Sequence, residues 1–238
     1  MGTVRSKDGT AIAFDQSGTG PALVLVGGAF QYRAIDERTT ELASRLAARF
    51  TVFHYDRRGR GESGDTAPYA TAREIEDLDA LISEAGGAAF VFGMSSGAAL
   101  ALDAAAQGLA IKKLAVYEPP FIVDDNRPPL PDDYVAHLTE LAASGRRGDA
   151  VAYFLTRGVG VPAEAVEQMR QAPIWPAFEA IAHTLAYDGA LVSSTGAGRP
   201  LPADRWASVA IPTLVADGGA SPAWMRNAAR ALADVLPN

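Results

Sequence analysis

The chain has 238 residues, of which 48% are hydrophobic and 21% charged, a composition typical of a globular protein with one substantial core. Its 21 Lys and Arg against 28 Asp and Glu give a net charge of −7, which disfavours nucleic acid and anionic membranes as partners. The absence of cysteine excludes disulfides, thiolate nucleophiles and zinc–thiolate sites.

The sequence shows neither a signal peptide nor a membrane-spanning segment. The polar start, residues 1–10, lacks the apolar centre of a signal peptide, and no 18 apolar residues follow one another anywhere in the chain. We expect a soluble protein, with the cytoplasm as its default compartment.

Apolar strands and amphipathic helices alternate along the first half of the chain. Residues 3–6 and 11–16 predict a hairpin around an Asp-Gly turn. Residues 22–26, Ala-Leu-Val-Leu-Val, are apolar without alternation, which is typical of a parallel strand buried on both faces. Further strands are predicted over 51–55, 89–92, 111–117 and 211–216, and helices over 36–50, from 71 and over 98–107. This alternation predicts an α/β fold with a mostly parallel sheet flanked by helices.

Two helix starts carry capping signals. Thr71 has Glu74 three residues later, the spacing of a capping box. Near the end of the chain, Ser221 precedes Pro222, which predicts a helix capped by the serine with proline at its first position.

A change of pattern interrupts the alternation of strands and helices. Prolines punctuate residues 119–131, and only helical patterns follow until about residue 206, over 134–144, 149–157, 163–170 and 176–187. We therefore predict a discontinuous core, residues 1–118 and 206–238, with an inserted helical cap at 119–205.

The segment Gly93-Met94-Ser95-Ser96-Gly97 lies between a predicted strand and a predicted helix, the context of a nucleophile elbow. A serine whose oxygen is lifted clear of the sheet needs a strained turn, and the residues two before and two after it must lack bulk. Gly93 and Gly97 meet this requirement. The pattern predicts Ser95 as a nucleophile.

An oxyanion hole requires two N–H donors close to such a serine. One is the N–H of the following residue, Ser96, and the second is expected in the loop Gly27-Gly28-Ala29-Phe30, with Ala29 as the donor. The alternative interpretation is that the paired glycines only end a strand.

The chain resembles the α/β-hydrolase fold family, in particular its capped, esterase-like serine hydrolases, over nearly its whole length. Four segments carry the resemblance: Leu23-Val-Leu-Val-Gly-Gly28, Tyr55-Asp-Arg-Arg-Gly-Arg-Gly-Glu-Ser63, Tyr117-Glu-Pro-Pro120 and Pro212-Thr-Leu-Val215. The second is similar to an Asp-x-Arg-Gly-x-Gly-x-Ser loop that is structural in the family. The resemblance implies a parallel sheet with a cap and a Ser-acid-His triad.

Two triad members depart from the family's pattern. The acid normally follows the seventh strand, where this chain has Asp217 and then Ser221 at the usual position; Glu118, after the sixth strand, is an equal candidate. The family's histidine follows an eighth strand, which this chain lacks together with the last helix. His54, His137 and His183 lie in a predicted strand and in predicted cap helices, and only His183 is a candidate substitute base.

We expect the 238 residues to be a shortened form of a longer hydrolase, with impaired turnover because a serine hydroxyl without a base is a weak nucleophile. The missing strand would leave the seventh strand as an edge, through which the chain could self-associate.

The leading functional hypothesis is a serine hydrolase acting on a small to medium ester, lactone or related acyl substrate, without metal or organic cofactor. Phe30, Met94, His183 and Tyr187 are predicted to contact the substrate. The alternative is a ligand-binding protein or pseudoenzyme that uses the same pocket without turnover.

A dinucleotide site is a third hypothesis, because Gly59-Arg-Gly61-Glu-Ser-Gly64 matches Gly-x-Gly-x-x-Gly. We reject it, since Pro68 separates the glycines from the next predicted helix and no helix N-terminus would meet the phosphates.

Overall fold

The computed structural model describes residues 1–237, so Asn238, the end of the second predicted core segment, lies outside the described residues. Seven strands form one sheet in the order β1-β2-β4-β3-β5-β6-β7. Their bounds are Gly2–Arg5, Ala11–Ser17, Ala22–Val26, Thr51–Tyr55, Ala89–Met94, Ile111–Tyr117 and Thr213–Ala216 for β1 to β7. The pairs β1–β2 and β2–β4 are antiparallel and all other pairs are parallel, which confirms the predicted hairpin and the α/β class.

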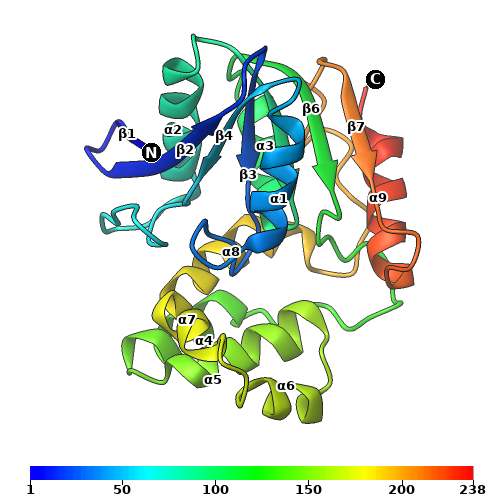
Figure 1. Ribbon diagram of the computed structural model, residues 1–238. Coiled ribbons are helices and arrows are strands. Elements are labelled where there is room, and N and C mark those ends of the chain that lie inside the picture. The colour runs from blue at the N-terminus through cyan, green and yellow to red at the C-terminus, as the bar shows by residue number, and fades with distance from the viewer. Residues whose placement is uncertain (238) are drawn as a thin grey trace.

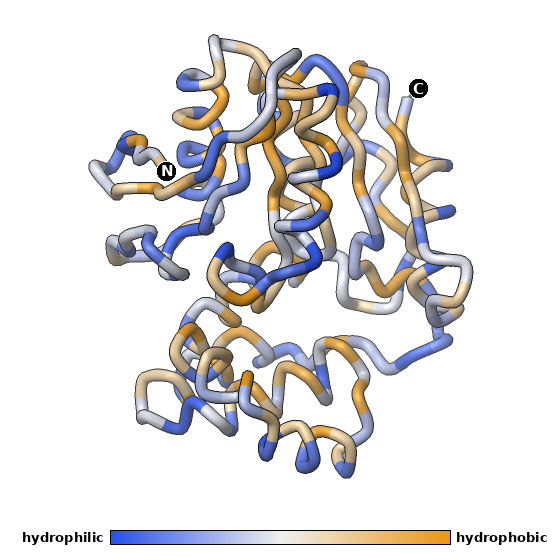
Figure 2. Tube along the Cα trace, viewed as in Figure 1, coloured by the Kyte–Doolittle hydropathy of each residue, from blue (hydrophilic) through white to orange (hydrophobic). Residues whose placement is uncertain are grey.

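Four helices flank the sheet: α1 (Glu37–Leu46), α2 (Thr71–Glu84), α3 (Ser96–Ala106) and α9 (Ala223–Val235). The main apolar core lies between the sheet and α2, α3 and α9, and it contains Val24, Val26, Leu100 and Leu232. On the opposite face α1 covers a smaller cluster built on Leu23, Leu25 and Val52. The central strands are therefore apolar on both faces. Figure 2 shows hydrophobic residues, in orange, along these strands.

Between β6 and β7 the described residues form helices and loops but no strand. The helices are α4 (Tyr134–Ala143), α5 (Arg147–Tyr153), a π-helix at Phe154–Val159, α6 (Ala163–Met169), α7 (Trp175–Ala180), α8 (Leu185–Val192) and 3₁₀ turns at Ala182–Thr184 and Ser193–Thr195. Most gather below the sheet in Figure 1 and share their own apolar cluster, which includes Leu138, Val151 and Trp175. We call residues 119–205 the insertion.

Both predicted helix caps are wrong. Thr71 is the first residue of α2, no side chain caps this helix, and the Glu74 carboxylate pairs with Arg57 instead. The N-cap of α9 is Pro222, and the Ser221 hydroxyl donates to Glu118 rather than to the helix. In both places the side chain that local spacing predicts as a capping group instead contacts a residue distant in the sequence.

The register of the parallel strands brings the candidate residues to one edge of the sheet. Val26 of β3 lies opposite Gly93 of β5, and Met94 lies opposite Tyr117 of β6. The residues that follow these three strands therefore meet at their carboxyl ends, where α/β sheets place their binding sites.

Candidate active site

Ser95 occupies a sharp bend between β5 and α3. Its backbone angles are φ 52° and ψ −124°, a conformation that is costly for a residue with a side chain. The bend is held from the neighbouring strand, because the Ser95 N–H donates to the Tyr117 carbonyl at 2.9 Å. Ser95 lines a cavity of about 140 Å³ on one side and an open cleft of about 360 Å³ on the other.

Three glycines make room for this bend. A Cβ on Gly93 would lie 2.6 Å from the Gly97 carbonyl oxygen, and one on Gly97 would lie 2.3 Å from the carbonyl oxygen of Val26. A Cβ on Gly28 would come within 2.8 Å of the Ser95 Cβ. Chain segments this close tolerate no side chain, which is the steric reason for the Gly-x-Ser-x-Gly spacing.

Two backbone N–H groups border the same cavity as Ser95. The carbonyl of Ser95 accepts from the Ala98 N–H at 2.9 Å inside the first turn of α3, so the Ser96 N–H of the same peptide points away from the helix. Ala29 also lines the cavity. Within residues 1–237 neither the Ser96 nor the Ala29 N–H has a hydrogen-bond partner.

The orientation of the Ala29 N–H depends on a buried arginine. Arg60 donates from Nη1 to the Gly28 carbonyl oxygen at 2.6 Å. In a trans peptide the C=O and the following N–H point in opposite directions, so this hydrogen bond turns the Ala29 N–H away from Arg60.

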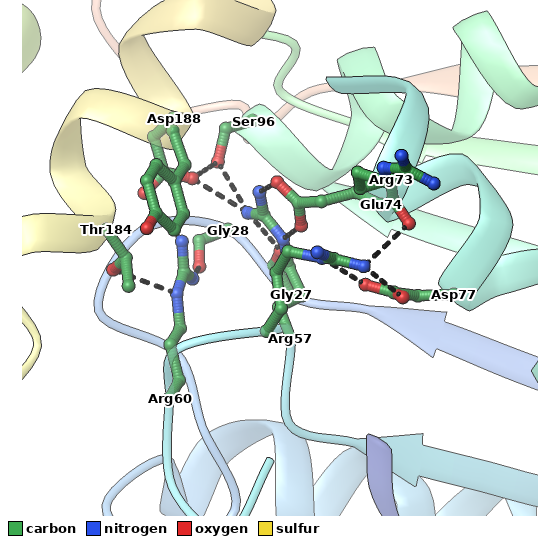
Figure 3. A network of polar contacts seen from close by, with 12 residues as sticks. Gly27, Gly28, Arg57, Arg60, Arg73, Glu74, Asp77, Ser96, Thr184 and Asp188 are labelled. Atoms are coloured by element: carbon green, nitrogen blue, oxygen red, sulfur yellow. Dashed lines mark hydrogen bonds and ion pairs between the residues drawn. The ribbon is translucent and has the colours of Figure 1, made fainter. Parts of the chain in front are cut away.

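Arg60 belongs to a buried network that joins the core to the insertion (Figure 3). The Asp188 carboxylate, on α8, accepts from Arg60 at 2.7 Å and from Arg57 at 2.7 Å. It also accepts from the Ser96 hydroxyl at 2.6 Å. Arg57 in turn forms two hydrogen bonds with Glu74, at 2.6 and 2.7 Å.

The charges of this network stabilise one another. Burial alone raises the pKa of Asp188, but the neighbouring Arg60 and Arg57 outweigh it and leave that pKa lowered. The sequence contained a signal for Asp188, a single carboxylate in the apolar run Leu185–Val192, which our sequence analysis missed.

The two candidate acids differ in their surroundings. Glu118 follows β6 with φ 50° and lines the open cleft together with Ser95. Its Oε1 accepts from the Gly218 N–H at 3.0 Å and from the Ser221 hydroxyl. Asp217 is exposed, lines neither the cavity nor the cleft, and within residues 1–237 makes no hydrogen bond or ion pair.

None of the three histidines, all within the described residues, lines the cavity or the cleft. His54 is buried in β4, and burial lowers its pKa. His137 contacts the Tyr153 ring from α4. His183 lies 3.4 Å from the Asp65 carboxylate, which also accepts from the Tyr187 hydroxyl at 2.9 Å.

The predicted substrate contacts divide accordingly. Phe30 lines the cavity and Met94 lines the cleft, each next to Ser95. His183 and Tyr187 are held against the loop at Asp65, outside both spaces. The Gly59–Gly64 loop carries Arg60 in the buried network, and no helix begins between Gly64 and Thr71.

The class of the protein follows from the fold and from the serine at the bend between β5 and α3. The model of the Alpha/beta hydrolase family matches residues 23–237, and the chain belongs to this family. More particularly, it is similar to the crystal structure of an alpha/beta hydrolase from Sphaerobacter thermophilus, with 62% sequence identity and a TM-score of 0.91 over 100% of this chain and 90% of that one.

Two further solved structures share the fold. An enol-lactonase from Burkholderia xenovorans is 20% identical, with a TM-score of 0.65 over 99% of this chain and 88% of that one. A thermophilic esterase from Thermogutta terrifontis is 22% identical, with a TM-score of 0.65 over 99% of this chain and 86% of that one. No helix among residues 1–237 is long and apolar enough to cross a membrane.

Proposed function

We propose that this protein is a capped, esterase-like serine hydrolase that cleaves small esters or lactones through Ser95. The observation that carries the proposal is the strained bend at Ser95, beside two unpartnered backbone donors in one cavity. The similarity to an esterase and an enol-lactonase supports the same chemistry.

The reaction follows from this geometry. The Ser95 Oγ attacks the substrate carbonyl, its proton passes to a base, and the alcohol leaves with a proton as the acyl-enzyme forms. Water then attacks the acyl group and releases the acid. The N–H groups of Ala29 and Ser96 stabilise the negative oxygen of each tetrahedral intermediate, and one such donor contributes about 3 kcal/mol.

The base is the group that the described residues do not provide. We propose that an imidazole in the cleft between Ser95 and Glu118 fills this role, with Glu118 as the carboxylate that orients it. Removing the histidine from a comparable triad costs about a millionfold in turnover. Turnover by these residues alone is therefore expected to be low.

A second function, ligand binding without turnover, is favoured by one observation: no histidine of residues 1–237 lines the cleft beside Ser95. The two functions differ in what Ser95 does, since binding alone does not require its hydroxyl.

The test is covalent labelling of the 238-residue chain by a fluorophosphonate, together with p-nitrophenol release from p-nitrophenyl acetate at increasing imidazole. We expect both the labelling of residue 95 and the release of p-nitrophenol to rise with imidazole, which supplies the base, beyond the background measured with Ser95→Ala. Ser83→Ala, which removes an exposed hydroxyl on α2, is the matched control and should behave as the unchanged protein. Release equal in the unchanged protein and Ser95→Ala, with no labelling at any imidazole concentration, would overturn the hydrolase and favour the non-catalytic alternative.

A further inference from the structure

The wall of the cavity beside Ser95 carries a buried polar side chain without a hydrogen-bond partner. Tyr134, at the start of α4, lines this cavity and is 3% exposed. Its hydroxyl is buried and has no hydrogen-bond partner within residues 1–237. A buried hydroxyl without a partner is unfavourable, so such a group on a cavity wall indicates a ligand that completes it.

The other polar side chains of the cavity wall are already paired. Asp188 accepts hydrogen bonds from Arg57, Arg60 and Ser96, and this pairing also uses the Ser96 hydroxyl. Apart from Ser95, the two backbone donors and the indole N–H of Trp224, the remaining lining is apolar, with Phe30, Leu130 and Phe154 among its members. Tyr134 is therefore the lining side chain whose polar atom is buried without a partner, and it can recognise a polar atom of the acyl group.

A π-helix keeps space free at this hydroxyl. The segment Phe154–Val159 places residues 154, 158 and 159 on the cavity wall. A Cβ on Gly158 would lie 2.2 Å from the Tyr134 hydroxyl oxygen, so only glycine leaves this position open. π-Helical turns occur often at functional sites. The Tyr134 ring is fixed in place by stacking on Tyr153, with ring centroids 5.5 Å apart.

Two charged side chains act on Tyr134, and they differ in their pairing: the Asp188 carboxylate is already bound by two arginines, whereas Arg127 supplies a positive charge that suits an oxygen acceptor. Arg127 donates to the Gly158 carbonyl at 3.0 Å and packs over the Trp224 ring at 4.4 Å. Within residues 1–237 no carboxylate forms an ion pair with Arg127, and burial lowers its pKa. Burial and the nearby Asp188 carboxylate raise the pKa of Tyr134, so its hydroxyl keeps its proton and can donate it in a hydrogen bond.

We propose that the acyl group of the substrate carries an oxygen acceptor, a ketone, hydroxyl or carboxylate, that binds the Tyr134 hydroxyl. The acyl group is also short. A cavity of about 150 Å³ holds one benzene molecule, so the 140 Å³ beside Ser95 accommodates roughly six non-hydrogen atoms. This inference rests on the proposed function, because it takes the cavity as the acyl site of Ser95.

The test compares the binding of two unreactive amides, pentanamide and 4-oxopentanamide, by NMR titration. They have the same carbon chain and differ by one ketone oxygen. We expect 4-oxopentanamide to bind more tightly, and Tyr134→Phe to weaken its binding roughly two- to tenfold while leaving pentanamide unchanged. Tyr153→Phe removes a neighbouring hydroxyl that lines neither space next to Ser95, and serves as the matched control.

Equal loss for both amides in Tyr134→Phe, no loss for either, or no measurable binding of 4-oxopentanamide would overturn the inference. Glutaramic acid, which carries a carboxylate, identifies the kind of acceptor. If it binds more tightly than 4-oxopentanamide, the site accepts a carboxylate; if it binds more weakly, the site accepts a ketone or hydroxyl. Gly158→Ala, which places a methyl group against the hydroxyl, should reproduce the loss seen with Tyr134→Phe.

These titrations do not depend on Ser95 chemistry. Selective loss in Tyr134→Phe without any labelling of Ser95 would keep the acceptor site and reject the hydrolase. A second outcome would keep the hydrolase and reject the acceptor site. In it, the fluorophosphonate labels Ser95, and p-nitrophenyl pentanoate and p-nitrophenyl 4-oxopentanoate are cleaved equally well by the unchanged protein and by Tyr134→Phe.

Discussion

At the scale of single residues, the sequence offers Glu118 and Asp217 as equal candidates for the catalytic acid, but their surroundings differ. Glu118 adopts a left-handed backbone conformation at the end of β6 and receives hydrogen bonds from Gly218 and Ser221. These contacts hold the carboxylate in the cleft that Ser95 also lines. Asp217 is exposed and has no such contacts among the described residues. The surroundings favour Glu118 as the acid that orients a base.

Glu118→Gln keeps an acceptor oxygen for both hydrogen bonds but removes the charge. We expect it to slow imidazole-dependent p-nitrophenol release roughly tenfold or more, since a hydrogen bond to a charged group contributes about 1.5 to 3 kcal/mol. Asp217→Asn, the matched control, should change the rate less than twofold. The reverse order of effects would transfer the role of acid to Asp217.

Residues whose position has a local steric cause could be predicted from the sequence. The bend at Ser95 requires small residues two positions before and after it, so the spacing of Gly93 and Gly97 was informative. Tyr134 and Asp188 could not be predicted in the same way. They reach the cavity from an insertion whose placement depends on tertiary contacts, and the open space at the Tyr134 hydroxyl depends on a glycine 24 positions later in the chain.

At the scale of elements, the loop after β4 connects the core to the insertion through buried charge. Arg57, Arg58 and Arg60 are each about 1% exposed. They pair with Glu74 and Asp77 on α2 and with Asp188 on α8. Helix α2 starts without a side-chain cap because its N-cap residue is Ala70, and Glu74 in its first turn serves this network. The sequence predicted the helix from its apolar spacing, whereas the partner of Glu74 depends on a loop folded against it.

Asp188→Asn should therefore destabilise the whole fold. Removing one partner of a buried ion pair costs about 3 to 5 kcal/mol, because the remaining charges stay buried. Denaturant unfolding of the variant measures this loss. Fluorophosphonate labelling of Ser95 should also slow, since Arg60 orients the Gly28 peptide. Asp149→Asn, in a partly exposed pair on α5, should cost less than about 1 kcal/mol. Equal stability of the two variants would contradict a structural role for the network.

The contribution of Asp188 has a defined pH range. Its pKa is lowered in the folded protein from an ordinary value of 3.8, so the folded state binds the proton less readily than the unfolded chain. The stabilisation is complete above about pH 4 and is lost as the pH falls below that value. The difference in unfolding free energy between the unchanged protein and Asp188→Asn should shrink over the same range.

At the scale of the whole molecule, the order of strands and helices followed the hydrophobic pattern, and the limits of prediction lie in the insertion. Predicted helices over 149–157 and 176–187 are each divided, the first into α5 and a π-helix and the second into α7, a 3₁₀ turn and the start of α8. Apolar spacing predicts that a segment is helical. It does not distinguish the hydrogen-bond pattern of each turn, which depends on packing against neighbouring helices. The proposed boundaries of the insertion remain a prediction.

The two faces of the sheet are covered unequally. Helices α2, α3 and α9 cover one face, whereas among residues 1–237 only α1 packs against the other. Beside α1 an apolar hollow of about 670 Å³ is lined by Phe90, Phe92 and Leu214, and Leu214 is 64% exposed. In the sheet formed by residues 1–237 strand β7 is an outer strand, and the backbone groups of an outer strand can pair with another chain.

We expect this face to cause concentration-dependent self-association, measurable by light scattering on a sizing column as a mass above 24.9 kDa that rises with protein concentration. Leu214→Lys places a charge on the hollow and on the strand edge, and should return the mass to that of the monomer. Ile174→Lys changes an exposed apolar residue of the insertion and adds the same charge, so it separates the effect of this face from a general gain in solubility. Association that persists in Leu214→Lys, or that Ile174→Lys abolishes equally, would show that another surface is responsible.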